Sequence, residues 1–147
     1  MDKATWILVT DAGRGRLFER VDGQTREVDD FVHPEGTRHR RALLSSPSGR
    51  RGKGAGPSAG LRSSTDVKEA SAESFARREA ARLKAGLDRH RYDALMLVAP
   101  PHFLGLLLAS LDPQVAKRIV ATLDRNYTRL TASALMARLG GPHALAP

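Results

Sequence analysis

The sequence has no cysteine among its 147 residues, which excludes a disulfide framework, thiolate catalysis and cysteine-ligated zinc or iron–sulfur sites. Aromatic residues make up only 5%, and they form no aromatic and basic stripe of the kind found on RNA-recognition sheets. The longest apolar run, 103–111, is interrupted by Gly105 and Ser110 and is far shorter than the ~20 residues of a membrane span. The amino-terminal residues lack a basic region followed by an apolar core, so we expect a cytoplasmic protein.

Positive charge is abundant and concentrated in one segment. The formal net charge is +8, and the segment 37–62 contributes +7 of it, with no acidic residue. We call this stretch the basic segment; its cations are Arg38, Arg40, Arg41, Arg50, Arg51, Lys53 and Arg62. Such a concentration indicates an anionic partner such as RNA, DNA or a membrane surface. The alternative is a solvated loop in a chain that uses arginine heavily throughout.

The chain length favours one domain, which we expect to span residues 1–139. Three apolar runs, at 6–10, 16–21 and 25–32, predict strands, and the Asp22-Gly23 pair is a strong signal for a hairpin between the second and third. Residues 34–65 show no periodicity and are rich in glycine, serine and proline, so we expect a long flexible loop there.

Helical periodicity begins at Asp66, which we expect to cap a helix together with Glu69 and to start a run that ends near 87–90. A fourth strand is predicted at 92–99, a short helix at 102–111, a turn of helix after Pro113 and a strand at 118–124. A last helix is expected at 131–139, followed by a disordered tail at 140–147. The resulting order, βββ–loop–αβαβα, predicts one mixed α/β sheet covered by helices.

This order suggests a ribonuclease-H-like arrangement, in which the carboxyl ends of neighbouring strands meet at one edge. Asp11, Pro101-His102 and Asp124–Asn126 would then converge, and open sheets bind ligands at that edge. Asp11, His102 and Asp124 are the candidate catalytic residues, with His102 as a possible general base or phosphate contact. A two-metal nuclease needs more carboxylates, and the fourth strand ends in prolines instead.

Motifs for cofactors and metals are missing from the sequence. The glycines of the basic segment do not match the phosphate-binding spacing GxxxxGK[ST], and no serine occupies a GxSxG elbow. The five histidines show no metal-ligand spacing. We therefore expect no cofactor and no bound metal.

Several ordered motifs resemble the bacterial host attachment protein family, named for proteins required for attachment to host cells. The opening stretch Thr5–Arg14 and the stretch Arg16–Glu19 carry the resemblance, together with Val32–Gly36 and Leu97–Gly105. Asp66–Glu69, with Glu73, Phe75 and Ala76, also fits the family pattern. The resemblance covers about residues 4–139.

More distantly, the layout is similar to the middle domain of archaeo-eukaryotic peptide release factors and Pelota-like ribosome-rescue proteins. In that group a loop after the three-stranded meander carries a Gly-Gly-Gln tripeptide that enters the peptidyl-transferase centre. Here the corresponding stretch reads Gly52-Lys53-Gly54-Ala55-Gly56 with no glutamine, since the only glutamines are Gln24 and Gln114. The resemblance therefore implies contact with ribosomal or transfer RNA without ester hydrolysis by that mechanism.

The sequence thus favours a non-enzymatic protein that contacts RNA, and the ribosome in particular, through its basic segment. One alternative is a factor for bacterial attachment that acts through protein or polysaccharide partners. Another is a hydrolase of tRNA esters or phosphoesters that uses Asp11, His102 and Asp124.

Overall fold

One mixed sheet of five strands organises the molecule. The computed structural model describes residues 3–34 and 57–139, with side chains along the first long helix described from residue 66 onward. The strands are β1 (Ala4–Thr10), β2 (Arg14–Val21), β3 (Gln24–Val32), β4 (Ala94–Val98) and β5 (Ile119–Leu123). The order across the sheet is β3-β2-β1-β4-β5, with an antiparallel β1–β2–β3 meander and parallel β1–β4 and β4–β5 pairs.

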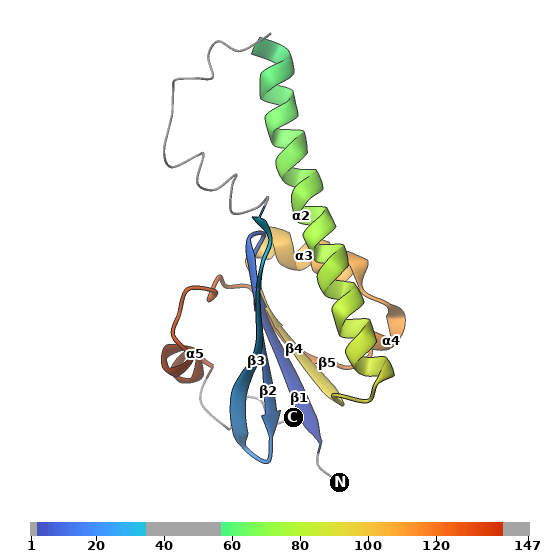
Figure 1. Ribbon diagram of the computed structural model, residues 1–147, viewed down its shortest axis with the longest axis vertical. Coiled ribbons are helices and arrows are strands. Elements are labelled where there is room, and N and C mark those ends of the chain that lie inside the picture. The colour runs from blue at the N-terminus through green and yellow to red at the C-terminus, as the bar shows by residue number, and fades with distance from the viewer. Residues whose placement is uncertain (1–2, 35–56, 140–147) are drawn as a thin grey trace.

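Helices cover both faces of this sheet. The described helices are α2 (Pro57–Asp88), α3 (Pro101–Ser110), α4 (Pro113–Ala116) and α5 (Ala132–Arg138). Figure 1 shows α2, α3 and α4 on one face and α5 on the other. The predicted α/β class and the single mixed sheet are confirmed. No helix in the described part of the chain is long and apolar enough to cross a membrane.

The alternation of side chains along β1 creates two apolar cores. Trp6 and Leu8 face α2, α3 and α4, where they pack with residues such as Phe75. Ile7 and Val9 face the opposite side, where Leu135 of α5 covers them. Because both faces of the central strands are buried, their sequences read as continuous apolar runs rather than as alternating ones.

The Asp22-Gly23 hairpin forms as predicted. Both residues have positive φ, 53° and 79°, which is the requirement of the tight hairpin turn that matches the twist of its two strands. The strands pair directly up to this turn, with Val21 opposite Gln24.

The expected start of the long helix at Asp66 is wrong. The helix α2 already begins at Pro57, so Asp66 lies inside it and does not cap it. Proline suits the first turn of a helix, because its fixed φ is helical and its missing N–H is not needed there. The first nine residues lack apolar periodicity because periodicity reports packing, not helix formation. Residues 35–56 of the expected loop, and the expected tail at 140–147, lie outside the described residues.

The amino-terminal part of α2 extends past the edge of the sheet (Figure 1). At 1.5 Å per residue, its 32 residues span about 48 Å. Between residues 66 and 88, the first buried side chains are Ser71 and Ala72, whereas Val67 is 50% exposed. The helix therefore carries the end of the basic segment, residues 57–62, away from the body of the fold.

Two helical glycines make a matched test of the packing. A Cβ on Gly86 of α2 would lie 2.4 Å from Cη2 of Trp6, whereas a Cβ on Gly105 of α3 would meet no atom within 4 Å. Trp6 stacks on Tyr92 at 4.6 Å between ring centroids, so it has little room to move.

We expect Gly86→Ala to lower the free energy of unfolding by about 2 kcal/mol, since overpacking outweighs the gain in helix propensity. Gly105→Ala should raise that free energy by up to about 1 kcal/mol. Urea unfolding followed by the fluorescence of Trp6, the single tryptophan, measures both. Equal effects of the two changes would contradict the close contact at Gly86.

Candidate functional site

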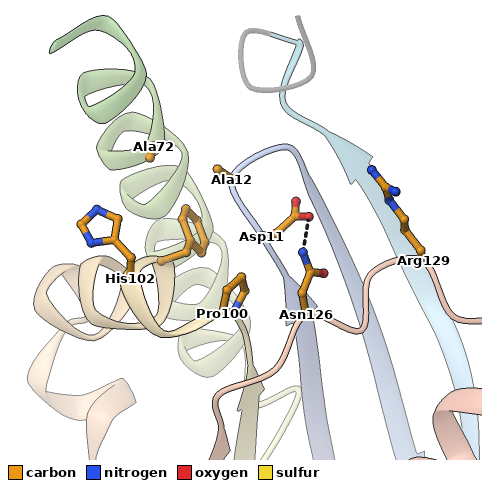
Figure 2. Close-up of a pocket in the computed structure, with 8 residues that line it drawn as sticks. Asp11, Ala12, Ala72, Pro100, His102, Asn126 and Arg129 are labelled. Atoms are coloured by element: carbon orange, nitrogen blue, oxygen red, sulfur yellow. Dashed lines mark hydrogen bonds between the residues drawn. The ribbon is translucent and has the colours of Figure 1, made fainter. Parts of the chain in front are cut away.

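The carboxyl ends of the parallel strands meet at one edge of the sheet, as the sequence predicts. Asp11 directly follows β1, Pro100 and His102 come after β4, and Asn126 comes after β5. These four residues line a pocket of about 310 Å³ together with Ala12, Ala72, Phe103 and Arg129 (Figure 2). Asp124, the third candidate catalytic residue, does not line this pocket.

Asp11 is a buried carboxylate that four donors hold in place. Its Oδ1 accepts hydrogen bonds from the backbone N–H groups of Gly13, at 2.8 Å, and Arg14, at 2.9 Å. Its Oδ2 accepts from the side chains of Asn126 and Thr128, both at 3.1 Å (Figure 2 shows the first). These bonds join the turn after β1 to the chain after β5, so Asp11 organises the edge of the sheet on which the pocket lies.

The other two candidate catalytic residues lie at the surface. The His102 side chain is 73% exposed, and its Nε2 lies 2.9 Å from Oε1 of Glu69 on α2. Asp124 is exposed and pairs with Arg125 at 3.1 Å. The structure thus brings Asp11 and His102 to one pocket, while Asp124 lies outside its lining.

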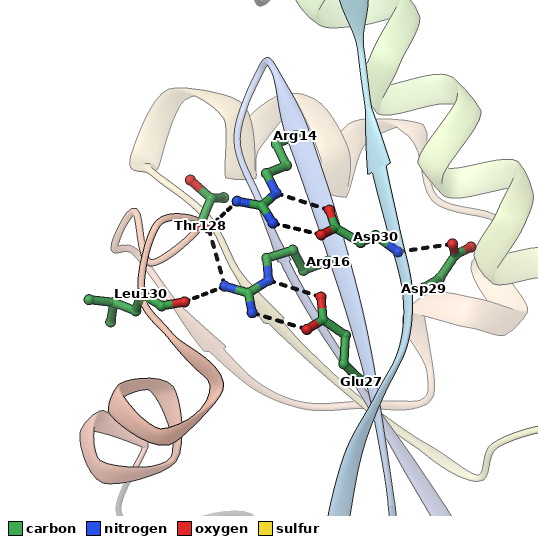
Figure 3. A network of polar contacts seen from close by, with 7 residues as sticks. All are labelled: Arg14, Arg16, Glu27, Asp29, Asp30, Thr128 and Leu130. Carbon is green, nitrogen blue, oxygen red and sulfur yellow. Dashed lines mark hydrogen bonds and ion pairs between the residues drawn. The ribbon is translucent and has the colours of Figure 1, made fainter.

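Two arginines of β2 fix the segment that follows β5 (Figure 3). Arg14 binds both carboxylate oxygens of Asp30, at 2.9 and 2.6 Å, and Arg16 binds both of Glu27, at 3.0 and 3.1 Å. Each guanidinium also donates to the carbonyl of Thr128 at 3.2 Å, and Arg16 donates to that of Leu130. The hydrogen bonds from Arg14 hold the pKa of Asp30 below its usual range. One side of the pocket is therefore rigidly supported.

Beside Asp11 lies a second buried carboxyl group, that of Glu79 on α2, which is 1% exposed. Thr10 Oγ1 lies 2.6 Å from Glu79 Oε2 and 3.0 Å from the carbonyl of Arg14. Its single hydroxyl hydrogen serves only one of these oxygens. A protonated Glu79 resolves this, because it donates to Thr10 while Thr10 donates onward to Arg14.

The surroundings of Glu79 favour this neutral form. Burial raises the pKa of Glu79 to about 8. Its Oε1 is buried without a hydrogen-bond partner among the described residues, which makes a negative charge there costly.

His33 ties the end of β3 to α2. Its ring is 1% exposed, stacks on Phe75 at 4.7 Å, and contacts Ser71 through Nε2 and Arg78 through Nδ1. Arginine only donates, so Nδ1 is the acceptor and Nε2 carries the hydrogen that it donates to Ser71 Oγ. His33 therefore fixes the chain just before the basic segment against the helix that follows it.

Most cations of the basic segment lie outside the described residues: Arg38, Arg40, Arg41, Arg50, Arg51 and Lys53. Arg62 lies within α2, in the part that extends past the sheet. Among the residues that the structure describes, no three His, Asp or Glu side chains gather in a way that could hold a metal ion.

The sequence interpretation missed Glu79, although its position carries a signal. It lies four residues after Phe75 and four before Leu83, two core residues of the same helix. Residues four positions apart lie on the same face of a helix, so this spacing places Glu79 on the apolar stripe and predicts that its carboxyl group is buried. The same spacing places Ser71, the partner of His33, four residues before Phe75.

Comparison with known proteins gives the fold and the family. One solved structure, titled "Archaeal protein", matches 97% of this chain and 34% of its own length, with 9% identity and a TM-score of 0.50. A crystal structure of an archaeal translation termination factor matches 92% of this chain and 37% of its own length, with 10% identity and a TM-score of 0.46. The chain thus spans about a third of the length of each.

No curated protein matches the chain significantly. A family model, described as "Protein required for attachment to host cells", matches residues 6–139. This match covers nearly all of the described fold, from β1 to the residue after α5. The chain therefore belongs to the host attachment protein family.

Proposed function

We propose that this protein is a non-enzymatic RNA-binding protein that contacts the ribosome or transfer RNA through its basic segment. The observation that carries the proposal is the charge of residues 37–62, which hold seven cations and no acidic residue. Neutralising phosphates with arginine and lysine releases counterions, which supplies most of the affinity in sequence-independent binding of nucleic acids.

The arrangement around the basic segment supports this proposal. The chain enters the segment just after His33, which contacts Ser71 and Arg78 of α2. It leaves the segment along the part of α2 that extends past the sheet (Figure 1). The described end of the segment, residues 57–62, therefore projects beyond the sheet, where a long polyanion has access.

The three candidate residues of the hydrolase alternative give it little support. The carboxylate of Asp11 already accepts four hydrogen bonds, and Asp124 pairs with Arg125 outside the pocket. A general base needs a reacting group within hydrogen-bond reach. Among the described residues, the polar contact of His102 is Glu69, which is not a nucleophile paired with a base.

The family description favours a second candidate, a factor in bacterial attachment that acts through protein or polysaccharide partners. Fractionation of cells separates the two. An attachment factor of this kind should be accessible on intact cells, whereas an RNA-binding protein should fractionate with the cytosol.

The direct test of RNA binding is the salt dependence of its affinity. Replacing Arg50, Arg51 and Lys53 with alanine should weaken binding to a single-stranded RNA. The slope of log K against log salt should flatten by about 2, at roughly 0.7 per lost phosphate contact. A control variant removes the same charge elsewhere, by changing the exposed Arg89, Arg91 and Lys117 to alanine. Equal losses in the two variants would show non-specific attraction and contradict the proposal.

A further inference from the structure

The pocket at the sheet edge is large enough for a small ligand. Its volume of about 310 Å³ lies at the lower end of the range for small-molecule sites. It opens between the amino-terminal end of α3, the turn after β1 and the segment after β5 (Figure 2). No residue of the proposed RNA contact lines it, so the proposed function does not account for it.

One part of the pocket lining is apolar. Ala12, Ala72, Pro100 and Phe103 form this part, and the Phe103 ring is only 3% exposed because it packs at 5.9 Å from Phe75 in the core. The polar groups beside it are engaged. Asp11 accepts four hydrogen bonds, one of them from the hydroxyl of Thr128. Asn126 donates to Asp11 and accepts from the backbone N–H of Thr128. The inner lining thus suits a flat apolar group better than a polyhydroxylated one, whose hydroxyls would stay unpaired.

A cation lies at one side of this apolar surface. Arg129 is exposed, lines the pocket and takes part in none of the ion pairs among the described residues. Figure 2 shows it across the pocket from His102, which is already paired with Glu69. A guanidinium binds phosphate oxygens through its fork of N–H donors. A ligand with a flat apolar body and one phosphate group therefore matches the pocket.

We infer that this pocket holds one nucleotide of the bound RNA, with its base against the apolar lining and a phosphate on Arg129; this inference rests on the proposed function. The described end of the basic segment, residues 57–62, belongs to the same helix, α2, as Ala72 in the pocket lining. Ala72 in the lining lies ten residues after Arg62 on α2, which is about 15 Å along the helix. A strand held at Arg62 thus reaches the pocket within a few nucleotides.

The inference also predicts little selectivity among bases. Contact between an apolar surface and the face of a base tolerates every base, because each has a flat face. Discrimination needs donors or acceptors aimed at base edges, and the polar groups of the inner lining serve Asp11 and Thr128 instead. AMP and UMP should therefore bind with similar affinity, and both should bind more tightly than their nucleosides or inorganic phosphate.

The test is a titration of the full chain with AMP, UMP, adenosine and inorganic phosphate, followed by NMR shifts of the backbone amides. The expected result is shifts at Ala12, His102, Phe103 and Arg129. Arg129→Ala should weaken AMP binding about tenfold, as the loss of a charge-assisted contact does. Arg125→Ala is the matched control, because Arg125 is exposed in the same segment and pairs with Asp124 outside the pocket. It should change the affinity by less than about twofold.

A second variant keeps the test independent of charge. Ala12→Leu fills the apolar part of the pocket, so it should abolish nucleotide binding while the fluorescence of Trp6 confirms the fold. Absence of pocket shifts with AMP and UMP would overturn the inference, and salt-dependent RNA binding in that case would leave the proposed function standing. Binding of free nucleotides without any RNA binding would overturn the proposed function and, with it, the assignment of the pocket to RNA.

Discussion

Replacing Glu79 with glutamine is expected to stabilise the protein increasingly as the pH rises, by about 5 kcal/mol in total. The ordinary pKa of a glutamate is 4.5, and burial raises that of Glu79 to about 8. Between these two values the unfolded chain has released its proton while the folded chain still holds it. Folding therefore takes up a proton, and the wild-type free energy of unfolding falls as the pH rises through this window.

Glutamine removes this dependence without changing the packing. Its amide donates to Thr10 Oγ1 as the protonated carboxyl group does, and its shape is the same. The measurement is urea unfolding of both proteins from about pH 4 to about pH 9, followed by Trp6 fluorescence. The partly buried Glu73 on the same helix gives the control, because Glu73→Gln makes the same chemical change away from the buried contact with Thr10. A wild type that gains stability over this range relative to Glu79→Gln would show that Glu79 folds as a carboxylate.

Removal of the Asp11 carboxylate is expected to have the second largest effect. Asp11→Ala leaves the backbone donors of Gly13 and Arg14 and the amide of Asn126 without their acceptor, while the Thr128 hydroxyl can turn to Oδ1 of Asn126. The free energy of unfolding should fall by about 4 kcal/mol. Asp11→Asn keeps one oxygen for the two backbone donors but sets its amide against the donors of Asn126 and Thr128. It should cost about 2 kcal/mol.

Asp124→Asn is the matched control for Asp11, since Asp124 lies exposed at the same edge and should change stability by less than about 0.5 kcal/mol. Both asparagine variants should keep their RNA binding under the proposed function. The contrary outcome is an Asp11→Asn variant that is as stable as the wild type but has lost a hydrolysis of tRNA esters or phosphoesters that the wild type catalyses. In that case the hydrolase alternative would replace the proposed RNA-binding function.

The arrangement of strands was predictable because its signals are local. Buried parallel strands appear as apolar runs such as Ala94–Val98, and Pro100-Pro101 and Asp112-Pro113 mark starts of helices that the structure confirms. The Asp22-Gly23 turn requires positive φ, which few residue pairs tolerate. Once the strand order follows, the meeting of Asp11 with His102 and Asn126 at one edge follows too.

The remaining features depend on contacts between distant residues, which local patterns do not record. The helix α2 begins nine residues before its predicted start at Asp66, because helix formation does not require an apolar stripe. The hydrogen bonds from Arg14 and Arg16 to the carbonyl groups of Thr128 and Leu130 join residues more than a hundred positions apart. The pocket itself arises from four separate segments, so its volume and its lone arginine emerge only in three dimensions.

The claim that the basic segment binds RNA is tested most directly by sedimentation of the tagged protein from cell lysate through sucrose gradients. The account predicts that the wild type migrates with ribosomal subunits at low salt and leaves them at moderate salt. The variant with alanine at Arg50, Arg51 and Lys53 should leave them at lower salt than the wild type does. A wild type that stays at the top of the gradient at low salt would contradict ribosome binding and favour attachment through protein or polysaccharide partners.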